Sequence, residues 1–481
     1  MEGAKKILTW LNGAGYEAYL VGGAVRDLLM GREPHDFDIV TAAHPDQVIE
    51  ILTQAGASHA NLVGKAFGVV VAGVDHKTYE VATYRREFYG AHAHRPEAIE
   101  YADSLEEDVL RRDFTVNGMA MDKEGRIIDL VGGQEDLKKK RLVTIGNPVD
   151  RFREDALRLF RACRFVTKLD FLPTKSLLEA MPQAFDRVSG LSLERVRSEL
   201  DQLLLEPAVA KGLDILVQSG LASCQCTYND GKVLRTIDIL PELSHLVDLP
   251  QEKDFHEFDA WYHTLVAVQE IAPDPILRWG ALLHDVGKGL DGVRAVRKGR
   301  LTDWGHDHVG AQLAHDLLMR LGYGKAFADR VAWLVKEHMK FHFFAQHGEA
   351  DAARWVRKEI QSGAYRSQAE LKEAFRQLAA VCAADIIACG KPHASTKGND
   401  SFRDCLLDLV DQMPIHSREL HYDGRLISAM GKEAKTYMPY LLEQVRSGRI
   451  PNEAGALLEA LEKKKKRLEG LGVRGETHEI N

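Results

Sequence analysis

Two carboxylates on alternate residues, preceded by a glycine turn, constrain this chain more than any other feature. Residues 19–27 read Tyr-Leu-Val-Gly-Gly-Ala-Val-Arg-Asp, and residues 36–40 read Asp-Phe-Asp-Ile-Val. The first segment predicts a short apolar strand that ends in two glycines, followed at once by a helix. The second predicts a strand that carries Asp36 and Asp38 on one face, because alternate residues of a strand point the same way.

This combination predicts a site for a metal-bound nucleotide. Two neighbouring carboxylates repel each other unless a cation lies between them, and Mg²⁺ prefers such oxygen ligands. Gly22 and Gly23 allow backbone N–H groups to approach a phosphate, and the helix start adds partial positive charge. A phosphate cradle beside metal-binding carboxylates is typical of nucleotidyl transfer with two metal ions. Each half alone is common in turns and exposed strands, so the prediction depends on their order and on the motifs that follow.

Four further motifs extend the pattern through residues 17–206. They read Leu-Arg-Arg-Asp-Phe-Thr-Val-Asn-Gly-Met-Ala at 110–120, Asp-Leu-Val-Gly-Gly-Gln-Glu-Asp-Leu at 129–137, Arg-Phe-Arg-Glu-Asp-Ala-Leu-Arg-Leu-Phe-Arg-Ala-Cys-Arg-Phe at 151–165, and Leu-Ser-Leu-Glu-Arg-Val-Arg-Ser-Glu-Leu at 191–200. With these motifs the chain resembles the tRNA nucleotidyltransferase and poly(A) polymerase family, which has a nucleotidyltransferase fold of the polymerase-beta type. That family usually has Ala where this chain has Gly118.

The resemblance implies that Asp36 and Asp38 are catalytic and bind Mg²⁺. The nucleotide-binding residues that it implies are Gly22, Gly23, Arg26, Arg112, Asp113, Asn117, Asp155, Arg158, Arg161 and Arg164. Arg112 and Asp113 belong to the segment that reads the ribose in the family, with a plain salt bridge at a helix start as the alternative. Glu80, on a predicted strand, is a candidate for a third acid near the metals, with an ordinary surface role as the alternative.

Residues 151–165 predict one helix with charged residues on one face. Asp155, Arg158, Arg161 and Arg164 are spaced by three, and such residues share a helix face. An exposed, salt-bridged face is the alternative.

The resemblance gives this stripe a role in reading the base. It implies that Asp155 accepts from an exocyclic amino group and that Arg158 donates to the neighbouring ring nitrogen. Cytosine and adenine offer that pattern, whereas uracil and guanine would leave buried charges unpaired. The pair would then select CTP and ATP, and Arg161 and Arg164 would place the base or hold phosphates.

The segment 85–97 is polar, basic and glycine-containing, which predicts a mobile loop. In the family, such a loop is needed for adding the terminal A, and enzymes that add only CC lack it. The segment therefore argues against a CC-only enzyme.

A second metal site is predicted within residues 256–385. An apolar helix leads into His284-Asp285-Val-Gly-Lys, with His263 upstream and Asp385 far downstream. Imidazole and carboxylate ligands together suit Mn, Ni, Co or Fe. The arrangement resembles the HD phosphohydrolase superfamily. That resemblance implies one metal on His263, His284, Asp285 and Asp385, with His306 and His338 holding a second metal or a substrate phosphate.

Some bacterial members of the nucleotidyltransferase family carry such a domain, with phosphatase or 2′,3′-cyclic phosphodiesterase activity. A bound metal and a phosphohydrolase activity are therefore expected. A degenerate domain with a purely structural role is the alternative.

The length and periodicity predict several domains. At 481 residues the chain is too long for one core, so roughly two to four domains are expected. Strand and helix signals alternate in the first part, and helical periodicity dominates afterwards. We predict an α+β protein with a mixed-sheet nucleotidyltransferase head (1–140), an all-helical neck that reads the base and binds RNA (141–250), an HD domain (251–395) and a helical, tRNA-binding tail (396–481).

Composition indicates the cellular compartment and the surfaces that could bind RNA. No apolar run reaches the length of a membrane span, the N-terminus lacks a signal-peptide core, and the 6 Cys are scattered without a CxxC pair, so a cytoplasmic protein is expected. The net charge of −8 means that any RNA contact must use local basic patches. The candidates are 138–141 and 463–467, although such lysine runs are usually solvated faces.

The predicted function is the addition of CCA to the 3′ end of tRNA from CTP and ATP, with an attached metal-dependent phosphohydrolase. The alternatives are the addition of A alone, a poly(A) polymerase, or an HD hydrolase whose N-terminal domain merely binds nucleotide. These motifs do not separate CCA addition from A addition, and they leave the oligomeric state open.

Overall fold

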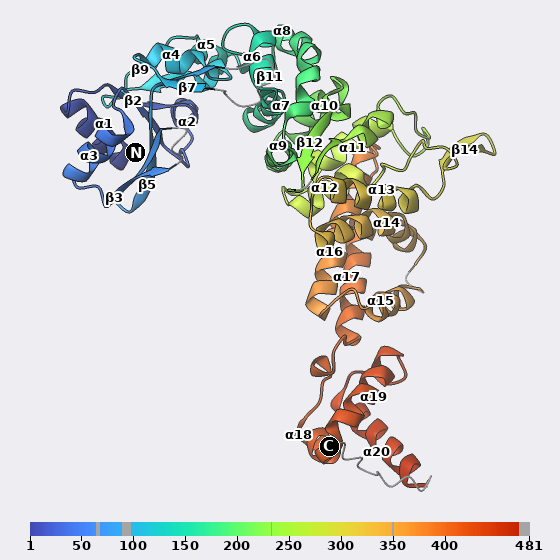
Figure 1. Cartoon of the computed structure of the whole chain (residues 1–481). Coiled ribbons are helices and arrows are strands. Elements are labelled where there is room, and N and C mark those ends of the chain that lie inside the picture. Colours follow the sequence, from blue (N-terminus) through green and yellow to red (C-terminus); the bar gives the residue numbers. More distant parts are fainter. Residues whose placement is uncertain (64–67, 89–97, 232, 349–350, 471–481) are drawn as a thin grey trace. The chain divides into compact units, whose positions relative to one another are not determined.

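A computed structural model describes residues 1–63, 68–88, 98–231, 233–348 and 351–470 (Figure 1). The chain forms two compact units, one of residues 1–247 with 320–322 and one of residues 248–319 with the chain from 323 onward. The predicted division into four parts is finer than this and stays a prediction.

The head of the first unit contains a mixed sheet, as predicted, and this sheet has seven strands. Its order is β3-β4-β5-β2-β1-β8-β9, in which β2 and β5 are parallel and the other neighbours are antiparallel. The strands are β1 (Ala18–Val21), β2 (Asp38–Thr41), β3 (His59–Val63), β4 (Val69–Val74), β5 (Lys77–Thr83), β8 (Met119–Met121) and β9 (Ile127–Asp129).

Alternation along the strands gives this sheet two different faces. Ile39 belongs to a core that α1 and α3 cover, whereas its neighbour Val40 packs on the opposite face against α4. Asp38 has the parity of Val40, so it lies on the face away from α1 and α3. The helices of the head are α1 (Glu2–Gly13), α2 (Gly23–Leu29), α3 (Pro45–Gln54), α4 (Leu105–Leu110) and the short η1 (Thr115–Asn117).

A separate antiparallel pair, β6 (Arg85–Phe88) and β7 (Ala98–Tyr101), flanks the segment expected to be a mobile loop. Residues 89–97 of that segment lie outside the described residues, so the loop stays a prediction.

The rest of the first unit is mainly helical. Its elements are α5 (Gly133–Lys138), β10 (Arg141–Leu142), α6 (Pro148–Glu154), α7 (Leu157–Leu169), β11 (Leu172–Pro173), α8 (Lys175–Ala180), η2 (Met181–Gly190), α9 (Leu193–Leu205), α10 (Val209–Gln218), η3 (Leu221–Ser223), β12 (Gln225–Asn229), β13 (Leu234–Asp238) and η4 (Pro241–Leu246). The expectation of an all-helical neck is therefore wrong in detail. β10 pairs with β11, and β12 and β13 form a hairpin whose Asn229-Asp-Gly231 run favours a tight turn.

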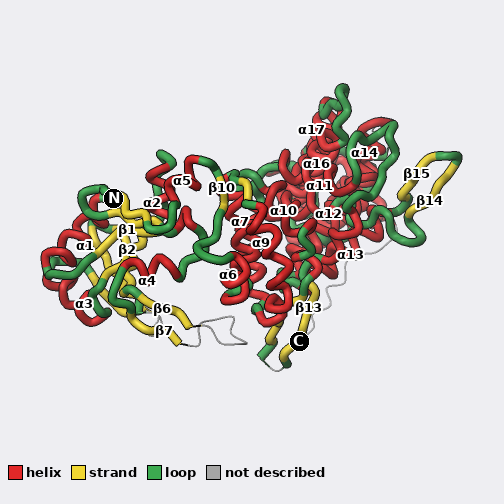
Figure 2. Tube along the Cα trace, turned by 90° about the horizontal axis from the view of Figure 1, so that it is seen from above, coloured by secondary structure: helices red, strands yellow, loops and turns green. Residues whose placement is uncertain are grey.

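The second unit packs its helices around α16. This helix contacts α11, α12, α14 and α17. The elements are α11 (Ala260–Glu270), α12 (Pro275–Leu283), β14 (Arg294–Arg297), β15 (Arg300–Asp303), α13 (His306–Arg320), α14 (Lys325–His347), α15 (Ala352–Gln361), α16 (Gln368–Ala388) and α17 (Lys397–Gln412). The β14–β15 hairpin extends away from these helices in both views (Figures 1 and 2).

The C-terminal helices have a small core of their own, which includes Leu426, Leu441 and Leu461. These elements are η5 (Ser417–Glu419), α18 (Gly424–Met430), η6 (Gly431–Glu433), α19 (Ala434–Arg446) and α20 (Ala454–Gly470). Among the described residues, every helix is too short or too polar to cross a lipid bilayer.

Candidate functional site

The two glycines form the turn between β1 and α2. Gly22 has a φ of +69°, a backbone conformation that residues with a Cβ rarely adopt. A Cβ on Gly22 would meet the guanidinium of Arg112 at 3.2 Å, and one on Gly23 would meet that of Arg26 at 3.4 Å. The glycines therefore let the backbone lie close to two guanidinium groups, a combination that attracts phosphate.

Three carboxylates interact beside this turn. Asp38 opens β2, and its register partner on the parallel strand β5 is Glu80. Asp36 lies outside the strand, which corrects the expectation that one strand carries both aspartates: β2 begins at Asp38, and on the side of β1 the pairing ends at Val21, the partner of Asp38. Partial desolvation raises the pKa of Asp38, as do the charges of Glu80 and Asp36, whereas Arg112 opposes the shift. A hard divalent cation would relieve this repulsion, so these oxygens fit Mg²⁺.

A buried aspartate on α4 holds the two arginines that follow that helix. Asp108 has no exposed surface, and its carboxylate accepts from Arg111 at 2.6 Å and from Arg112 at 2.9 Å. Burial opposes ionisation of Asp108, but Arg112 and Arg111 together lower its pKa. The Arg112 guanidinium is thereby fixed next to Gly22.

Asp113 is the centre of a buried hydrogen-bond network. One of its oxygens accepts from the Asn117 amide at 3.0 Å, and the other accepts from Arg161 at 2.5 Å. Asn117 in turn accepts from Arg26 at 2.6 Å. Although burial favours the protonated acid, Arg161 and these hydrogen bonds lower the pKa of Asp113 to about 2. Asp113 therefore positions Arg161 and Asn117, and its own carboxylate is already occupied.

The predicted charged stripe does not lie on one continuous helix. α6 ends at Glu154, Asp155 is extended with φ −140°, and α7 begins at Leu157. The Asp155 carboxylate accepts from the backbone N–H of Leu157 and from Arg195 at 2.7 Å. The three-residue spacing of the charges predicted one helix and gave no sign of this break. The helix is interrupted because the Asp155 side chain accepts from a nearby backbone N–H, which competes with continuation of the helix.

The arginines of the stripe are mostly buried rather than solvated. Arg158 is 6% exposed and donates to Glu154 at 2.5 Å and to the carbonyl oxygen of Arg111 at 2.8 Å. Arg164 donates to the buried Glu199 at 2.5 Å. The explanation as an exposed salt-bridged face is therefore wrong for Arg158 and Arg164.

One cavity of about 420 Å³ brings most of the predicted nucleotide-binding residues together. Those that line it are Gly22, Gly23, Arg26, Asp38, Arg112, Asp113, Asn117, Asp155, Arg158 and Arg161. Asp36 and Arg164 are not among its lining residues. The prediction missed the lining residues Glu87, Arg111, Leu157, Phe165, Lys168 and Arg195. Four of these six residues, Arg111, Leu157, Phe165 and Arg195, lie inside the motifs at 110–120, 151–165 and 191–200, and that position was a signal for them.

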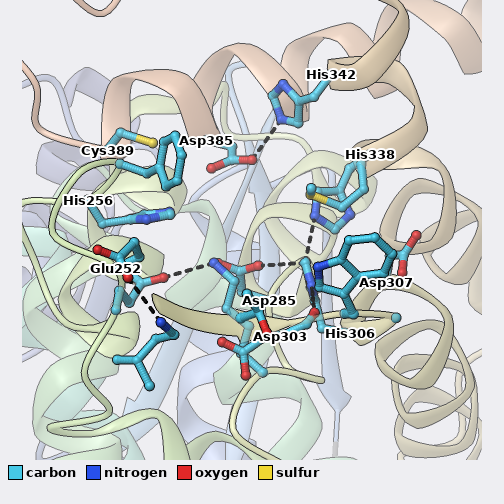
Figure 3. Close-up of a pocket in the computed structure, with 18 of the residues that line it drawn as sticks. Glu252, His256, Asp285, Asp303, His306, Asp307, His338, His342, Asp385 and Cys389 are labelled. Carbon is cyan, nitrogen blue, oxygen red and sulfur yellow. Dashed lines mark hydrogen bonds and ion pairs between the residues drawn. The ribbon is translucent and has the colours of Figure 1, made fainter. Parts of the chain in front are cut away.

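The six predicted ligands of the second site also meet, although they come from five places in the sequence. Asp285, His306, His338 and Asp385 are labelled in Figure 3. They are His263 on α11, His284 and Asp285 after α12, His306 at the start of α13, His338 on α14 and Asp385 on α16. Nε2 of His263 lies 3.1 Å from Nε2 of His284 and 3.1 Å from Oδ1 of Asp385. Nε2 of His306 lies 3.3 Å from Nε2 of His338.

Asp285 lies between these two groups. Its Oδ2 is 3.2 Å from Nε2 of His284, and its Oδ1 is 3.3 Å from Nε2 of His306. His284 and Lys288 hold the pKa of Asp285 well below its usual range, although burial favours the protonated acid. Asp285 would therefore be within reach of a cation held by either group of imidazoles.

Backbone carbonyls orient the imidazoles. Nδ1 of His306 lies 2.7 Å from the carbonyl oxygen of Asp303, and Nδ1 of His338 lies 2.6 Å from that of Val335. Since a carbonyl only accepts, each Nδ1 carries the proton and each Nε2 directs a lone pair at the other ring. Two lone pairs that face each other at 3.3 Å require a proton or a cation between them. The donor set therefore fits imidazole-binding transition metals.

Sequence reasoning missed four neighbours of this cluster. His342 contacts Oδ2 of Asp385 at 2.8 Å, and Lys288 contacts Oδ2 of Asp285 at 2.6 Å. His256 and Cys389 form, together with His263, a further group of possible ligand atoms. His342 lies one helical turn after His338 and Lys288 lies three residues after Asp285, so spacing offered a signal for these two. A cavity of about 540 Å³ opens over the cluster.

Three family descriptions match separate parts of the chain. They are "Poly A polymerase head domain" at residues 18–143, "Probable RNA and SrmB- binding site of polymerase A" at residues 170–223, and "HD domain" at residues 262–383.

Similar proteins carry one consistent description. The CCA-adding enzyme of Lactococcus lactis subsp. cremoris (strain MG1363) is 40% identical over 351 residues, which are 70% of this chain and 82% of that enzyme. The CCA-adding enzyme of Bacillus pumilus (strain SAFR-032) is 37% identical over 290 residues, which are 60% of this chain and 64% of that enzyme, slightly less than two thirds of its length. The crystal structure of the Bacillus stearothermophilus CCA-adding enzyme in complex with CTP matches with a TM-score of 0.63 and 25% identity, and the match covers 98% of each chain.

Proposed function

Because this chain belongs to the family of CCA-adding enzymes, we propose that it adds C, C and A to the 3′ end of tRNA from CTP and ATP without a nucleic-acid template. The observation that carries the proposal is the 420 Å³ cavity, which joins the glycine turn and Asp38 to several guanidinium groups. Such a cavity suits a triphosphate with its metal at one end and its base at the other. A cytoplasmic location is part of the proposal, since tRNA and both nucleotides are found there.

The reaction forms a bond between the tRNA 3′-oxygen and the α-phosphorus. The bond from that phosphorus to the bridging oxygen breaks, the hydroxyl proton passes to water, and the bridging oxygen leaves as part of pyrophosphate. Mg²⁺, when bound by Asp36 and Asp38 with Glu80 as a third acid, lowers the pKa of the hydroxyl and neutralises charge on the phosphates. Arg26 and Arg112 are suited to bind the triphosphate, because both guanidinium groups lie against the glycine turn.

Base selection is proposed for Asp155 and Arg158. In this structure Asp155 binds Arg195 and Arg158 binds Glu154. A cytosine or adenine edge would have to share these groups with, or take them from, their present partners. Uracil and guanine present the opposite pattern and would leave the same charges without partners, which is the basis of their exclusion. Arg161 is held by Asp113 and faces the same cavity.

The second cluster supports a phosphohydrolase activity. We propose that His263, His284, Asp285 and Asp385 hold one transition metal (Mn, Ni, Co or Fe) and that His306 and His338, with Asp285, hold another. Such metals supply an activated water for attack on a phosphoester. In that hydrolysis water oxygen bonds to phosphorus, and the ester oxygen leaves with a proton. Lys288 and His342 contact the two aspartates and keep them in place.

The basic runs are proposed contacts for the tRNA acceptor stem, although several of their cations already have partners. Lys139 lies 2.5 Å from Glu135, and Arg141 lies 2.6 Å from Asp136. In the C-terminal run, Lys463 pairs with Glu459. The pairs of Lys139 and Lys463 are exposed and contribute little to stability, so a phosphate backbone can compete for these cations, whereas the Asp136 partner of Arg141 is buried.

The deciding experiment offers tRNA transcripts that end before CCA, after C and after CC, each with one nucleoside triphosphate at a time. The expected products are C additions on the first two transcripts and a single A on the third. Addition of A alone on the third transcript, with no C addition, would identify an A-adding enzyme, and long A tails on any transcript would identify a poly(A) polymerase. No addition to any of them would leave the HD hydrolase as the remaining function.

A further inference from the structure

Two exposed aromatic side chains stand at the mouth of the cavity over the HD cluster. Phe255 is 60% exposed and Trp304 is 70% exposed, and both line that cavity. Phe255 lies in the loop before α11, and Trp304 lies between β15 and α13. Large rings exposed to water beside a functional cavity mark a surface that contacts a ligand.

The two aromatic residues belong to connected segments. The backbone N–H of Leu301 on β15 donates to Glu252 at 3.0 Å, and Arg300 pairs with Asp254 at 2.8 Å. We call residues 251–256 together with 294–304 the collar. Because these contacts connect its two halves, the collar presents both rings at one opening.

The tip of the collar concentrates positive charge. Arg297 and Arg300 are direct cross-strand partners on β14 and β15, with Lys298 at the turn between them. Asp254 already pairs with Arg300, so the positive charge that this tip offers to an anionic ligand is mainly that of Arg297 and Lys298. The Arg297 guanidinium also lies 5.1 Å from the centre of the Trp304 ring, which places a cation and a stacking surface side by side.

We propose that the collar binds the 3′-terminal segment of a single-stranded oligonucleotide and presents its terminal phosphoester to the HD cluster. A base stacks on Trp304, and the preceding phosphates bind Arg297 and Lys298. A free mononucleotide would use the ring but not the cations of the hairpin, and a simple phosphate ester would use neither. The inference rests on the proposed function only for the chemistry at the cluster, since the collar itself is a binding surface.

Hydrolysis by the full-length protein loaded with Mn²⁺ tests the proposal. The substrates are a trinucleotide with a 3′-phosphate, adenosine 3′-monophosphate and glycerol 2-phosphate, which has no aromatic ring. We expect Trp304→Ala to raise KM for the trinucleotide by about tenfold, because stacking of one base contributes that much to binding. The same variant should leave the hydrolysis of glycerol 2-phosphate unaffected. Trp304→Phe should restore most of the loss.

A variant of Arg297 provides a second, independent test of the proposal. Arg297→Ala should raise KM for the trinucleotide and weaken the salt dependence of its binding, while KM for the mononucleotide stays unchanged. Val296→Ala is the matched control, because Val296 is the neighbouring residue of β14 and is 69% exposed. An equal loss on all three substrates would mean that the collar supports only the fold or the metals, and no change on any of them would mean that it binds nothing.

A binding measurement tests the role of the collar separately from the proposed phosphohydrolase activity. The fluorescence anisotropy of a 5′-labelled trinucleotide is measured with saturating CTP, which blocks the other cavity. If the wild-type protein hydrolyses none of the substrates, the phosphohydrolase proposal fails, and the collar is then judged by anisotropy alone. Weaker binding by Trp304→Ala would support the collar, and equal binding by both proteins would overturn it.

Discussion

Asp38 on β2 and Glu80 on β5 are register partners across the parallel pair of the head sheet. Their side chains share one face, and the pKa of Asp38 is raised by partial desolvation and by the charge of Glu80. The relationship places an acid from a distant segment beside the aspartates of the Asp-x-Asp motif. Of the two roles considered for Glu80, this position favours a third metal ligand over an ordinary surface residue.

Removing these acids should stop nucleotide addition. We expect Asp36→Ala and Asp38→Ala to lower the rate of CTP incorporation by at least about a hundredfold, since each removes charge that compensates the metal. Glu80→Gln should lower it less and raise the Mg²⁺ concentration needed. Asp75→Asn, on an exposed acid paired with Lys6, is the control. Normal incorporation by Asp36→Ala and Asp38→Ala would refute the assignment of this site.

Replacing Arg158 should affect both choice of nucleotide and stability. Arg158→Ala removes the proposed donor to the base, so UTP and GTP incorporation should rise relative to CTP by about tenfold or more. It also removes the partner of one Glu154 oxygen, while Arg151 keeps the other, and it removes the donor to the carbonyl oxygens of Arg111 and Arg151. The expected cost is about 2 kcal/mol in the free energy of unfolding. Competition assays with mixed triphosphates and urea unfolding measure the two effects. Arg153→Ala, whose partner Asp186 is exposed, should change neither. Undiminished exclusion of UTP and GTP at wild-type turnover would assign base reading to other residues.

The two chemistries should separate by mutation. We expect the His284→Ala, Asp285→Ala double variant to lose transition-metal content and any phosphoesterase activity, while nucleotide addition in Mg²⁺ persists. Elemental analysis and both assays, with a melting curve, measure this. The surface pair His315 and Asp316 offers a matched His-Asp control, because both side chains are partly exposed. Retained metal in the double variant would refute the ligand set. Loss of nucleotide addition in a variant that melts normally would show that the two sites are coupled.

Asp113 should make the first unit sensitive to acid. Its pKa of about 2 in the folded protein lies below the ordinary value of 3.8, so the carboxylate stabilises the fold above pH 4, and this contribution is lost as the pH falls from 4 towards 2. The contribution amounts to about 2 kcal/mol at neutral pH. The difference in unfolding free energy between wild type and Asp113→Asn should therefore be largest near pH 7 and shrink below pH 4. A difference that stays constant in urea unfolding from pH 7 to pH 2.5 would exclude this role.

The sequence determined the features that short spans of chain encode. The turn at Gly22 and Gly23, the strand that carries Asp38, and the His284-Asp285 pair after an apolar helix all follow from local periodicity and residue chemistry. The mixed sheet and the helical remainder follow from the same signals, because strand and helix periods differ. The ligand set of the HD cluster needed more than periodicity. It came from a resemblance, and the structure brings the six residues together.

Only the tertiary structure decided which groups meet. The pairing of Asp38 with Glu80 depends on the order of strands in the sheet. The hydrogen bond from Arg161 to Asp113 depends on how α7 packs on the head. The break at Asp155 has a local partner, the backbone N–H of Leu157, and a distant one, Arg195, and only the contact with Arg195 depends on packing. Local spacing carries no information about such contacts, since their free energy comes from burial and hydrogen bonds between segments that only packing brings together.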